Sequence, residues 1–305
     1  MTLRKSFAGA FAFFALTSVG HAADMQPVLK APGAVDQQAT GYVEVYSGWA
    51  RTTVDSFNDG SERFNGWALG GAGRGNYWIS RDMSVQVDAQ AEGTSYDDRF
   101  GDFSTHSYLV GGHWSWRNPQ QYLFGLFGGI GDAGGGFSSS QRTGLIGAEA
   151  QWYWHQFTLY AQVGYDTTLT SNGSSDTNAW FIRGTGRYFI NPNFMLEGTV
   201  MYANGDIDFN FGSVGFETWS WQAKAEWRFA TAPFSVFAKY QGSETSYDQF
   251  SVDKVTDHRV LLGLKLHMGD RTLQQTDRAG ATLDIISPTA NPTSPVMTGV
   301  AGPQP

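Results

Sequence analysis

From Trp219 to Phe229 the chain alternates strictly between apolar and polar residues. The polar positions are Ser220, Gln222, Lys224, Glu226 and Arg228. A period of two predicts a β-strand with one apolar and one polar face. Aromatic residues occupy both ends of the apolar face. Such a face is typical of a strand in an outer-membrane barrel, where it meets lipid while the polar face lines the interior.

Segments with this period recur from about residue 40 to residue 268. They predict twelve strands, at roughly residues 40–51, 64–79, 82–95, 104–116, 120–131, 141–154, 156–167, 178–190, 193–205, 215–229, 233–243 and 257–268. Short connections such as Asn191-Pro192 alternate with longer ones such as residues 206–214. An outer-membrane barrel has an even number of strands, short periplasmic turns and longer external loops. We therefore predict an all-β fold, a single transmembrane antiparallel up-and-down β-barrel of about twelve strands over residues 40–268.

A soluble β-sandwich or a lipocalin-like barrel would also contain many short strands. The aromatic residues argue against both, because on several strands they bracket the apolar face at gaps of eight to ten residues. Such a gap spans roughly 19–23 Å in a tilted strand, close to the apolar band of about 25 Å between the aromatic girdles of membrane barrels. The predicted girdle residues are Trp49, Trp67, Tyr77, Tyr108, Trp114, Trp116, Trp152, Trp154, Trp180, Tyr188, Trp219 and Trp227.

The two ends of the chain lack this alternation. Arg4 and Lys5, a short apolar run and Gly20-His21-Ala22 have the pattern of a secretory signal peptide, so we predict that residues 1–22 direct export to the bacterial outer membrane. Residues 23–39 predict a periplasmic linker. Residues 269–305 gather five prolines and predict a disordered periplasmic tail.

Composition narrows the possible functions. The formal net charge of −8 argues against nucleic acid as a partner. Cysteine and a Gly-x-Ser-x-Gly motif are both missing, and the histidines lack metal-ligand spacing. We therefore predict no enzyme activity, no cofactor and no metal site.

The polar faces of the strands carry charges of both signs. The predicted lumen-lining residues are Glu44, Arg74, Asp88, Glu92, Glu149, Asp166, Arg183, Arg187, Glu197, Lys224, Glu226, Arg228, Lys239 and Lys265. In a closed barrel the last strand pairs with the first, so we expect Lys265 near Glu44, and Arg183 or Arg187 near Glu197. These charges either line an aqueous passage or form salt bridges that fill the lumen. We favour a narrow passage.

Small residues on the same face bear on this choice. One sector of the lumen is thinly lined, by Ala68, Gly70 and Ala72 on one strand and by Gly125, Gly129 and Gly131 on another. This sector either leaves room for a solute or relieves crowding between strands.

The predicted external loops are acidic. Their carboxylates are Asp55, Asp59, Glu62, Asp97, Asp98, Asp102, Asp132, Asp176, Asp206, Asp208, Glu244, Asp248, Asp253 and Asp257, against the bases Arg63, Arg99 and Lys254. An acidic mouth concentrates cations and predicts a weak cation preference. The same carboxylates could instead engage divalent ions that bridge lipopolysaccharide.

The segment Ala22-Ala23-Asp24-Met25-Gln26-Pro27-Val28-Leu29-Lys30-Ala31-Pro32 resembles the start of alphaproteobacterial outer-membrane porin-like proteins. The segment from Arg259 to His267 resembles the last strand of that family. The resemblance implies an outer-membrane location and passive passage of solutes, and it assigns no functional residue. This chain departs from the family in having more strands than the common eight and a tail after the last strand.

The sequence thus predicts a narrow passive channel for small hydrophilic solutes or ions. The alternative is a closed barrel with an envelope-structural or surface-interaction role through its acidic external loops. The expected partners are outer-membrane lipid and lipopolysaccharide, the barrel-insertion machinery, and small polar solutes or ions. The sequence does not specify an oligomeric state.

Overall fold

The computed structural model describes residues 38–56, 60–97, 103–135, 138–171, 175–209, 212–248 and 252–287. The predicted signal peptide, most of the predicted linker and the tail from residue 288 lie outside these residues.

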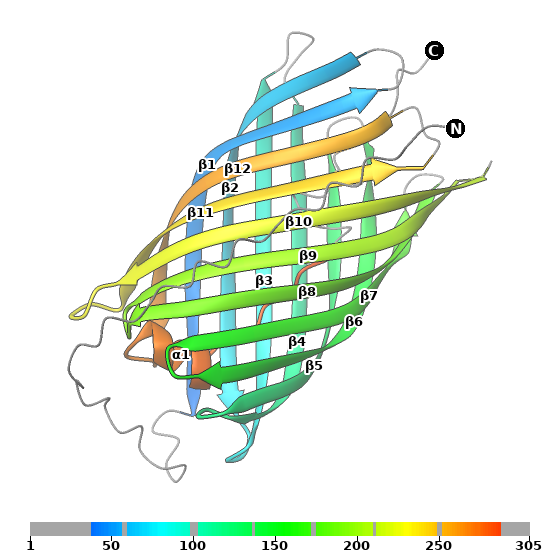
Figure 1. The fold of residues 1–305 in the computed structure, drawn as a ribbon. Helices are drawn as coiled ribbons and strands as arrows, with labels where there is room; N and C mark the ends of the chain where they lie inside the picture. Colours follow the sequence, from blue (N-terminus) through cyan, green and yellow to red (C-terminus); the bar gives the residue numbers. More distant parts are fainter. Residues whose placement is uncertain are drawn as a thin grey trace, which may run out of the picture. The chain divides into compact units, whose positions relative to one another are not determined.

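The described residues form a closed barrel of twelve antiparallel strands, in which each strand pairs with its neighbours in sequence and β12 pairs with β1 (Figure 1). The strands are β1 (Ala39–Ser56), β2 (Gly60–Trp78), β3 (Met83–Asp97), β4 (Phe103–Asn118), β5 (Tyr122–Gly135), β6 (Ser138–Trp154), β7 (Phe157–Ser171), β8 (Ser175–Asn191), β9 (Phe194–Phe209), β10 (Gly212–Arg228), β11 (Phe234–Tyr247) and β12 (Val252–Met268). The predicted fold class is confirmed.

The two ends of the barrel differ in how well the sequence predicted them. At one end, called the turn end here, lie the start of β1, the end of β12 and short turns such as residues 192–193. Its strand boundaries fall within a few residues of the prediction. At the opposite loop end the strands run further than predicted, and β12 begins at Val252 rather than at residue 257. Strand pairing continues there because backbone hydrogen bonds need no apolar face.

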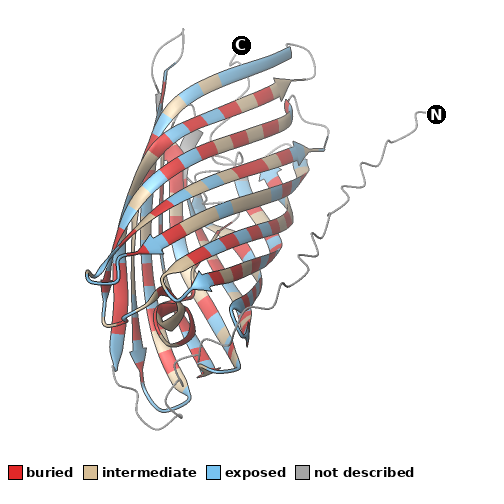
Figure 2. Ribbon diagram, turned by 60° about the vertical axis from the view of Figure 1, so that its left-hand side comes forward, coloured by how far each residue is buried: buried red, intermediate tan, exposed pale blue. Residues whose placement is uncertain are grey.

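The side chains alternate between an exposed outer face and a buried inner face along each strand (Figure 2). On β10, Trp219 and Trp227 are 51% and 55% exposed, whereas Glu226 and Arg228 are 1% and 4% exposed. The apolar faces therefore point out of the barrel and the charged faces point in, as an outer-membrane barrel requires. Among the helices of the described residues, none is long and apolar enough to cross a membrane.

After β12 the chain turns into the barrel. Gly269 makes this turn at φ 95°, a left-handed conformation that favours glycine. The helix α1 (Leu273–Ala279) follows, with Thr272 as its N-cap: the Thr272 hydroxyl accepts a hydrogen bond from the Gln275 amide at 3.1 Å. Residues 280–287 then continue without regular structure. We call residues 270–287 the inner segment.

The predicted disordered tail is therefore wrong for the inner segment. Prolines 288, 292, 295, 303 and 305, which suggested disorder, all lie beyond it and outside the described residues. The inner segment itself is ordered by the barrel wall, because Leu283 and Ile285 bury apolar surface against it while Asp277 and Asp284 keep charged partners there.

Candidate functional site: the barrel interior

The inner segment is held by side chains from many strands. Arg187 on β8 contacts Asp277 at 2.7 Å, and Arg117 on β4 donates a hydrogen bond to the Gly280 carbonyl at 2.9 Å. The indole Nε1 of Trp78 on β2 donates to the Ala279 carbonyl at 2.9 Å. These contacts place α1 across the turn end of the lumen, where sequence reasoning expected open space.

The extended part of the inner segment packs against the wall made by β3 to β9. The Ile285 side chain lies in an apolar cluster with Leu109, Phe127, Leu145, Phe181, Met201 and Ala203. On the other side of the backbone, Asp284 forms an ion pair with Arg183 at 2.6 Å. An alternation of apolar and polar residues from Thr282 to Ile285 is the sequence signal that could have revealed this wall contact.

The thinly lined sector of the wall is filled by protein side chains. A Cβ atom added at Gly111 would collide with Cδ1 of Ile285, and one added at Gly129 would lie 3.4 Å from the same atom. At Gly70 the Tyr46 ring occupies the space, and at Gly125 the Glu149 side chain does. At Gly70, Gly125 and Gly129 the space is therefore taken by bulky protein neighbours and not left for a solute.

All the predicted lumen-lining residues lie on the inner face. The buried ones are Asp88, Glu92, Glu149, Asp166, Arg183, Arg187, Glu197, Glu226, Arg228 and Lys265. The partly buried ones are Glu44, Arg74, Lys224 and Lys239.

Two predicted ion pairs are confirmed. Lys265 lies 3.3 Å from Glu44 across the β1–β12 seam, and Arg187 lies 2.8 Å from Glu197 on the neighbouring strand. Lys265 also contacts Glu226 at 3.0 Å, and Lys224 contacts Glu226 at 3.2 Å. The pairs extend into a network because each carboxylate has two oxygens and can form ion pairs with more than one cation.

Sequence reasoning misplaced Asp257 and did not single out Arg259. Asp257 was assigned to an external loop, but it is 2% exposed on the inner face of β12. It lies 2.8 Å from Arg259, which is fully buried and also pairs with Glu92. Both residues share the inward parity of Lys265 and lie within the predicted strand 257–268, so applying the alternation to the first residues of that strand would have found them.

His113 on β4 lies on the inner face and is buried. Its Nδ1 lies 2.7 Å from Glu149, and its Nε2 lies 3.3 Å from Asp88. The imidazole therefore bridges two carboxylates in the β3–β6 part of the wall. Within the described residues, no group of three or more histidine, cysteine or acidic residues is arranged to hold a metal ion.

A cavity of about 140 Å³ remains between the inner segment and the opposite wall. It reaches from the level of α1 at Thr276 to the level of Glu92 and Gln241, and it is bordered mainly by β1, β3 and β9 to β12. Its charged lining includes Glu44, Arg74, Glu197, Lys224, Lys239 and Lys265. This is space of a size for several water molecules or part of a small polar solute.

Apolar side chains line the lumen at the loop end. One cluster contains Val54, Val252 and Val255, with Phe64 packed against it. A second cluster contains Ala179, Ile207 and Phe216, with Phe209 packed against it. Tyr247 packs against both clusters and joins them. We call these residues the apolar collar; a hydrophobic constriction of this kind resists wetting by water and ions.

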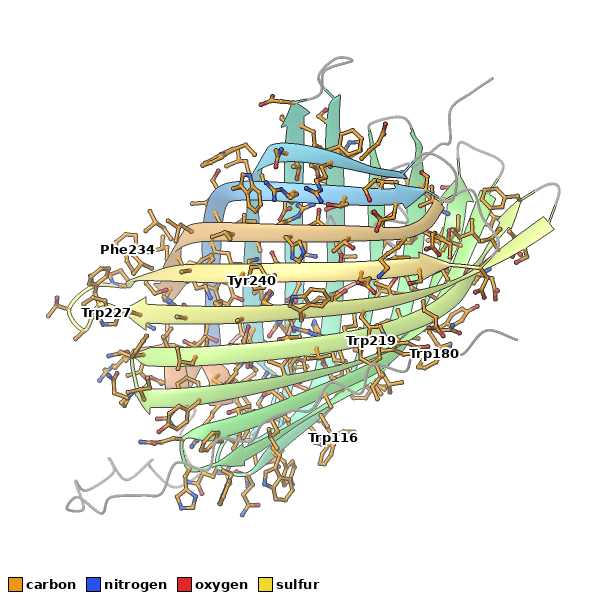
Figure 3. The ribbon with its side chains drawn as sticks, turned by 45° about the horizontal axis from the view of Figure 1, so that its top comes forward. Trp116, Trp180, Trp219, Trp227, Phe234 and Tyr240 are labelled. Carbon is orange, nitrogen blue, oxygen red and sulfur yellow. The ribbon has the colours of Figure 1, made fainter. Side chains whose placement is uncertain are left out.

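The outer surface carries the predicted girdle residues, which are all exposed except Tyr188. Tyr188 is half-buried, with its ring centroid 4.6 Å from that of Phe157. Trp180 and Trp219 lie toward the loop end and Trp227 and Phe234 at the turn end of the outer face (Figure 3). Between these levels the face is aliphatic, with Leu69 and Ile146 65% and 69% exposed.

Apart from Asp257, the acidic residues that were assigned to the external loops and are described in the structure lie at the loop end. Asp97, Asp176, Asp206, Asp208, Asp248 and Asp253 are exposed there. Glu244 is paired with Lys254 at 3.2 Å. Asp59, Asp98 and Asp102 lie outside the described residues.

Two carboxylates of the inner segment have opposite pKa shifts. Burial raises the pKa of Asp270 to about 6. Burial also acts to raise the pKa of Asp284, but the charge and hydrogen bonds of Arg183 outweigh it and hold that pKa well below its usual range. At neutral pH the ionised form of Asp284 therefore stabilises the docked inner segment, whereas ionisation of the buried Asp270 destabilises it.

No model of a known protein family and no curated protein matches this sequence. Among solved structures, an outer membrane channel from Pseudomonas putida F1 aligns with a TM-score of 0.59 and 13% identity, covering 80% of this chain and 100% of that chain. The β domain of the Bordetella autotransporter BrkA aligns with a TM-score of 0.45 and 9% identity, covering 76% of this chain and 100% of that chain. The likeness to the Pseudomonas channel shows that this chain has the fold of an outer-membrane β-barrel.

Proposed function

We propose that the chain forms a narrow passive channel of the bacterial outer membrane for small hydrophilic solutes or ions, with a weak preference for cations. The charged cavity beside the inner segment carries this proposal, because polar side chains border free space there. A twelve-stranded barrel lies between small barrels filled by side chains and wide porins. The inner segment narrows such a barrel without filling it.

The route runs along the wall of β9 to β12 and β1. It meets the apolar collar near the loop end and α1 at the turn end. Passage therefore requires small movements at both levels, and a solute must be small to follow it. The acidic loop end supports the cation preference, since carboxylates around an opening raise the local concentration of cations.

The proposed orientation puts the turn end in the periplasm and the loop end outside the cell. Residues 1–22 act as a signal peptide, residues 23–39 as a periplasmic linker, and the chain after the inner segment as a periplasmic tail. The exposed aliphatic band and its aromatic girdles suit contact with outer-membrane lipid and lipopolysaccharide, and insertion involves the barrel-insertion machinery. The likeness to outer-membrane barrels supports this location.

Liposome swelling tests the proposal. The refolded full chain is placed in liposomes, which are then exposed to sugars of increasing size, with protein-free liposomes as the control. A pentose is expected to enter faster than in the control, and a tetrasaccharide is expected to stay out. Equal swelling rates with and without folded protein, for every sugar, would overturn the channel proposal.

The alternative function is a closed barrel that acts in envelope structure or surface interaction through its acidic loops. One observation favours it: α1 covers the turn end and is anchored by Arg117, Arg187 and Trp78. In that case liposomes stay sealed to all solutes while the exposed carboxylates at the loop end bind divalent cations.

A further inference from the structure

Lys239 on β11 is the exception among the charged residues of the cavity. Among the described residues, no carboxylate lies within 4.0 Å of its Nζ atom, and Nζ instead sits 4.4 Å from the centre of the Tyr46 ring. The other bases of the cavity, such as Arg74 and Lys265, have acidic partners. Lys239 therefore presents its ammonium group to the cavity without a counter-ion from the described part of the chain.

The carboxylates nearest to Lys239 are engaged elsewhere. Glu44 pairs with Lys265 at 3.3 Å. Glu92 pairs with Arg259 and accepts a hydrogen bond from the Tyr46 hydroxyl at 2.8 Å. Neither can move to Lys239 without giving up a buried partner, which is costly in free energy.

The strand register adds a second cation beside Lys239. Lys239 lies directly opposite Lys224 on β10. Like charges at directly opposed positions destabilise a sheet. Lys224 forms ion pairs with Glu226 at 3.2 Å and with Glu197 at 3.9 Å. Among the described residues, Lys239 has no such ion pair.

Next along the inner face of β11 lies Gln241, whose side chain also borders the cavity. Its Oε1 atom is buried and, among the described residues, accepts no hydrogen bond. A buried acceptor without a donor is costly and marks a place where a donor is missing. Among the described residues, Lys239 is thus a cation without a carboxylate partner and Gln241 Oε1 an acceptor without a donor, on neighbouring inward positions of a single strand.

We propose that Lys239 and Gln241 form a binding site for a small solute that carries a carboxylate together with a hydroxyl or ammonium group. The carboxylate binds the Lys239 ammonium group, and the hydroxyl or ammonium donates to Gln241 Oε1. The apolar carbon atoms rest against the rings of Tyr46 and Phe237, which border the same cavity. When such a solute carries an ammonium group, that charge suits the acidic loop end and its carboxylate suits the Lys239 ammonium group. The inference rests on the proposed channel, because it names the solute class that the same cavity selects.

Calorimetric titration of the full chain in lipid nanodiscs tests the site without measuring transport. The probe is glycolate, which has one carboxylate and one hydroxyl, and the comparison probe is its neutral amide, glycolamide. Glycolate is expected to bind at least about ten-fold more tightly than glycolamide, since a hydrogen bond to a charged group is stronger than one to a neutral group. Equal binding of the two probes to the unchanged protein overturns the proposal.

Variants then locate the site. Lys239→Met is expected to weaken glycolate binding about ten-fold, and Lys239→Arg, which keeps the charge, to stay within about three-fold. Lys254→Met at the loop end removes the same charge away from the cavity and is the matched control. Glycolate binding that survives Lys239→Met in folded protein, or that falls equally in Lys254→Met, overturns the site. If glycolate binds in the calorimetric titration but the liposomes remain sealed, the channel proposal fails and the binding site stands. If the protein conducts but binds no glycolate, the binding site fails and the channel proposal stands.

Discussion

Arg183 on β8 and Asp284 in the inner segment are 101 residues apart in sequence and form a two-pronged ion pair. Nη1 lies 2.6 Å from Oδ1, and Nη2 lies 2.7 Å from Oδ2. A paired contact of this kind fixes the orientation of both groups as well as their distance. It therefore holds the inner segment against one wall of the barrel and leaves the cavity along the other.

Replacing Asp284 should release the inner segment. Asp284→Asn leaves the buried Arg183 guanidinium without its counter-ion, at a cost of about 3 kcal/mol, or roughly two orders of magnitude in the docking equilibrium. Limited trypsin digestion of the folded barrel measures this release, since Arg278 in α1 becomes accessible only when the segment leaves the lumen. Asp253→Asn at the exposed loop end is the matched control. A cleavage rate at Arg278 equal to that of the unchanged protein would contradict the anchoring role.

Docking of the inner segment should depend on pH in two opposite directions. Asp270 has a raised pKa of about 6 when docked, so its contribution is full below its ordinary pKa of about 3.9 and is lost as pH rises through about 6. Asp284 has a lowered pKa when docked, so its contribution is present above about pH 4 and is lost as pH falls below that value. Docking should therefore be tightest near pH 4 and should weaken as the pH moves away from that value in either direction.

Hydrogen exchange of the α1 amides, corrected for the intrinsic pH dependence of exchange, measures this profile. Between pH 5 and pH 8 the protection of α1 should fall, by at most about 3 kcal/mol. Asp270→Asn, which cannot ionise, should remove that fall and leave the loss at low pH. A fall that persists unchanged in Asp270→Asn would show that another group controls docking.

The charge of the cavity wall should set ion selectivity. Lys224→Gln removes one positive charge from the cavity lining and should raise the cation-to-anion permeability ratio by roughly two-fold. Reversal potentials in a potassium chloride gradient measure the ratio. Arg81→Gln, on the exposed turn between β2 and β3, removes the same charge outside the cavity. If both variants shift the reversal potential equally, ions do not pass Lys224.

The apolar collar should limit conduction. Tyr247→Ala separates the two apolar clusters that this ring joins, and it should raise single-channel conductance by about two-fold or more. Tyr240→Ala on the same strand removes the same ring from the outer face, where Tyr240 is 39% exposed, and should leave conductance unchanged. An unchanged current in Tyr247→Ala would place the main barrier elsewhere, with α1 as the remaining candidate.

The strands could be predicted from the sequence because the membrane imposes the alternation that Trp219 to Phe229 displays most clearly. Beyond the membrane both faces of a strand meet water or a narrow lumen, so the pattern fades there. Residues 252–256 at the loop end of β12 were missed for that reason. The lumen charges followed from the same parity, and the Lys265–Glu44 pair followed from barrel closure.

The inner segment was missed because its fold depends on partners more than a hundred residues away. Asp284 needs Arg183, and Ile285 needs the gap that glycines such as Gly111 leave in the wall. Two local signals were present: Thr272 and Gln275 at the spacing of a helix N-terminus, and the alternation around Leu283 and Ile285. Neither signal says where in the barrel the segment lies.

Single-channel recording of the refolded full chain in a planar lipid bilayer tests the central claim most directly. A narrow passage beside the inner segment predicts discrete, small current steps with a cation-biased reversal potential, and larger steps for Asp284→Asn, in which the segment is released. A silent bilayer containing correctly folded, heat-modifiable protein, with Asp284→Asn equally silent, would contradict the claim that the barrel interior conducts.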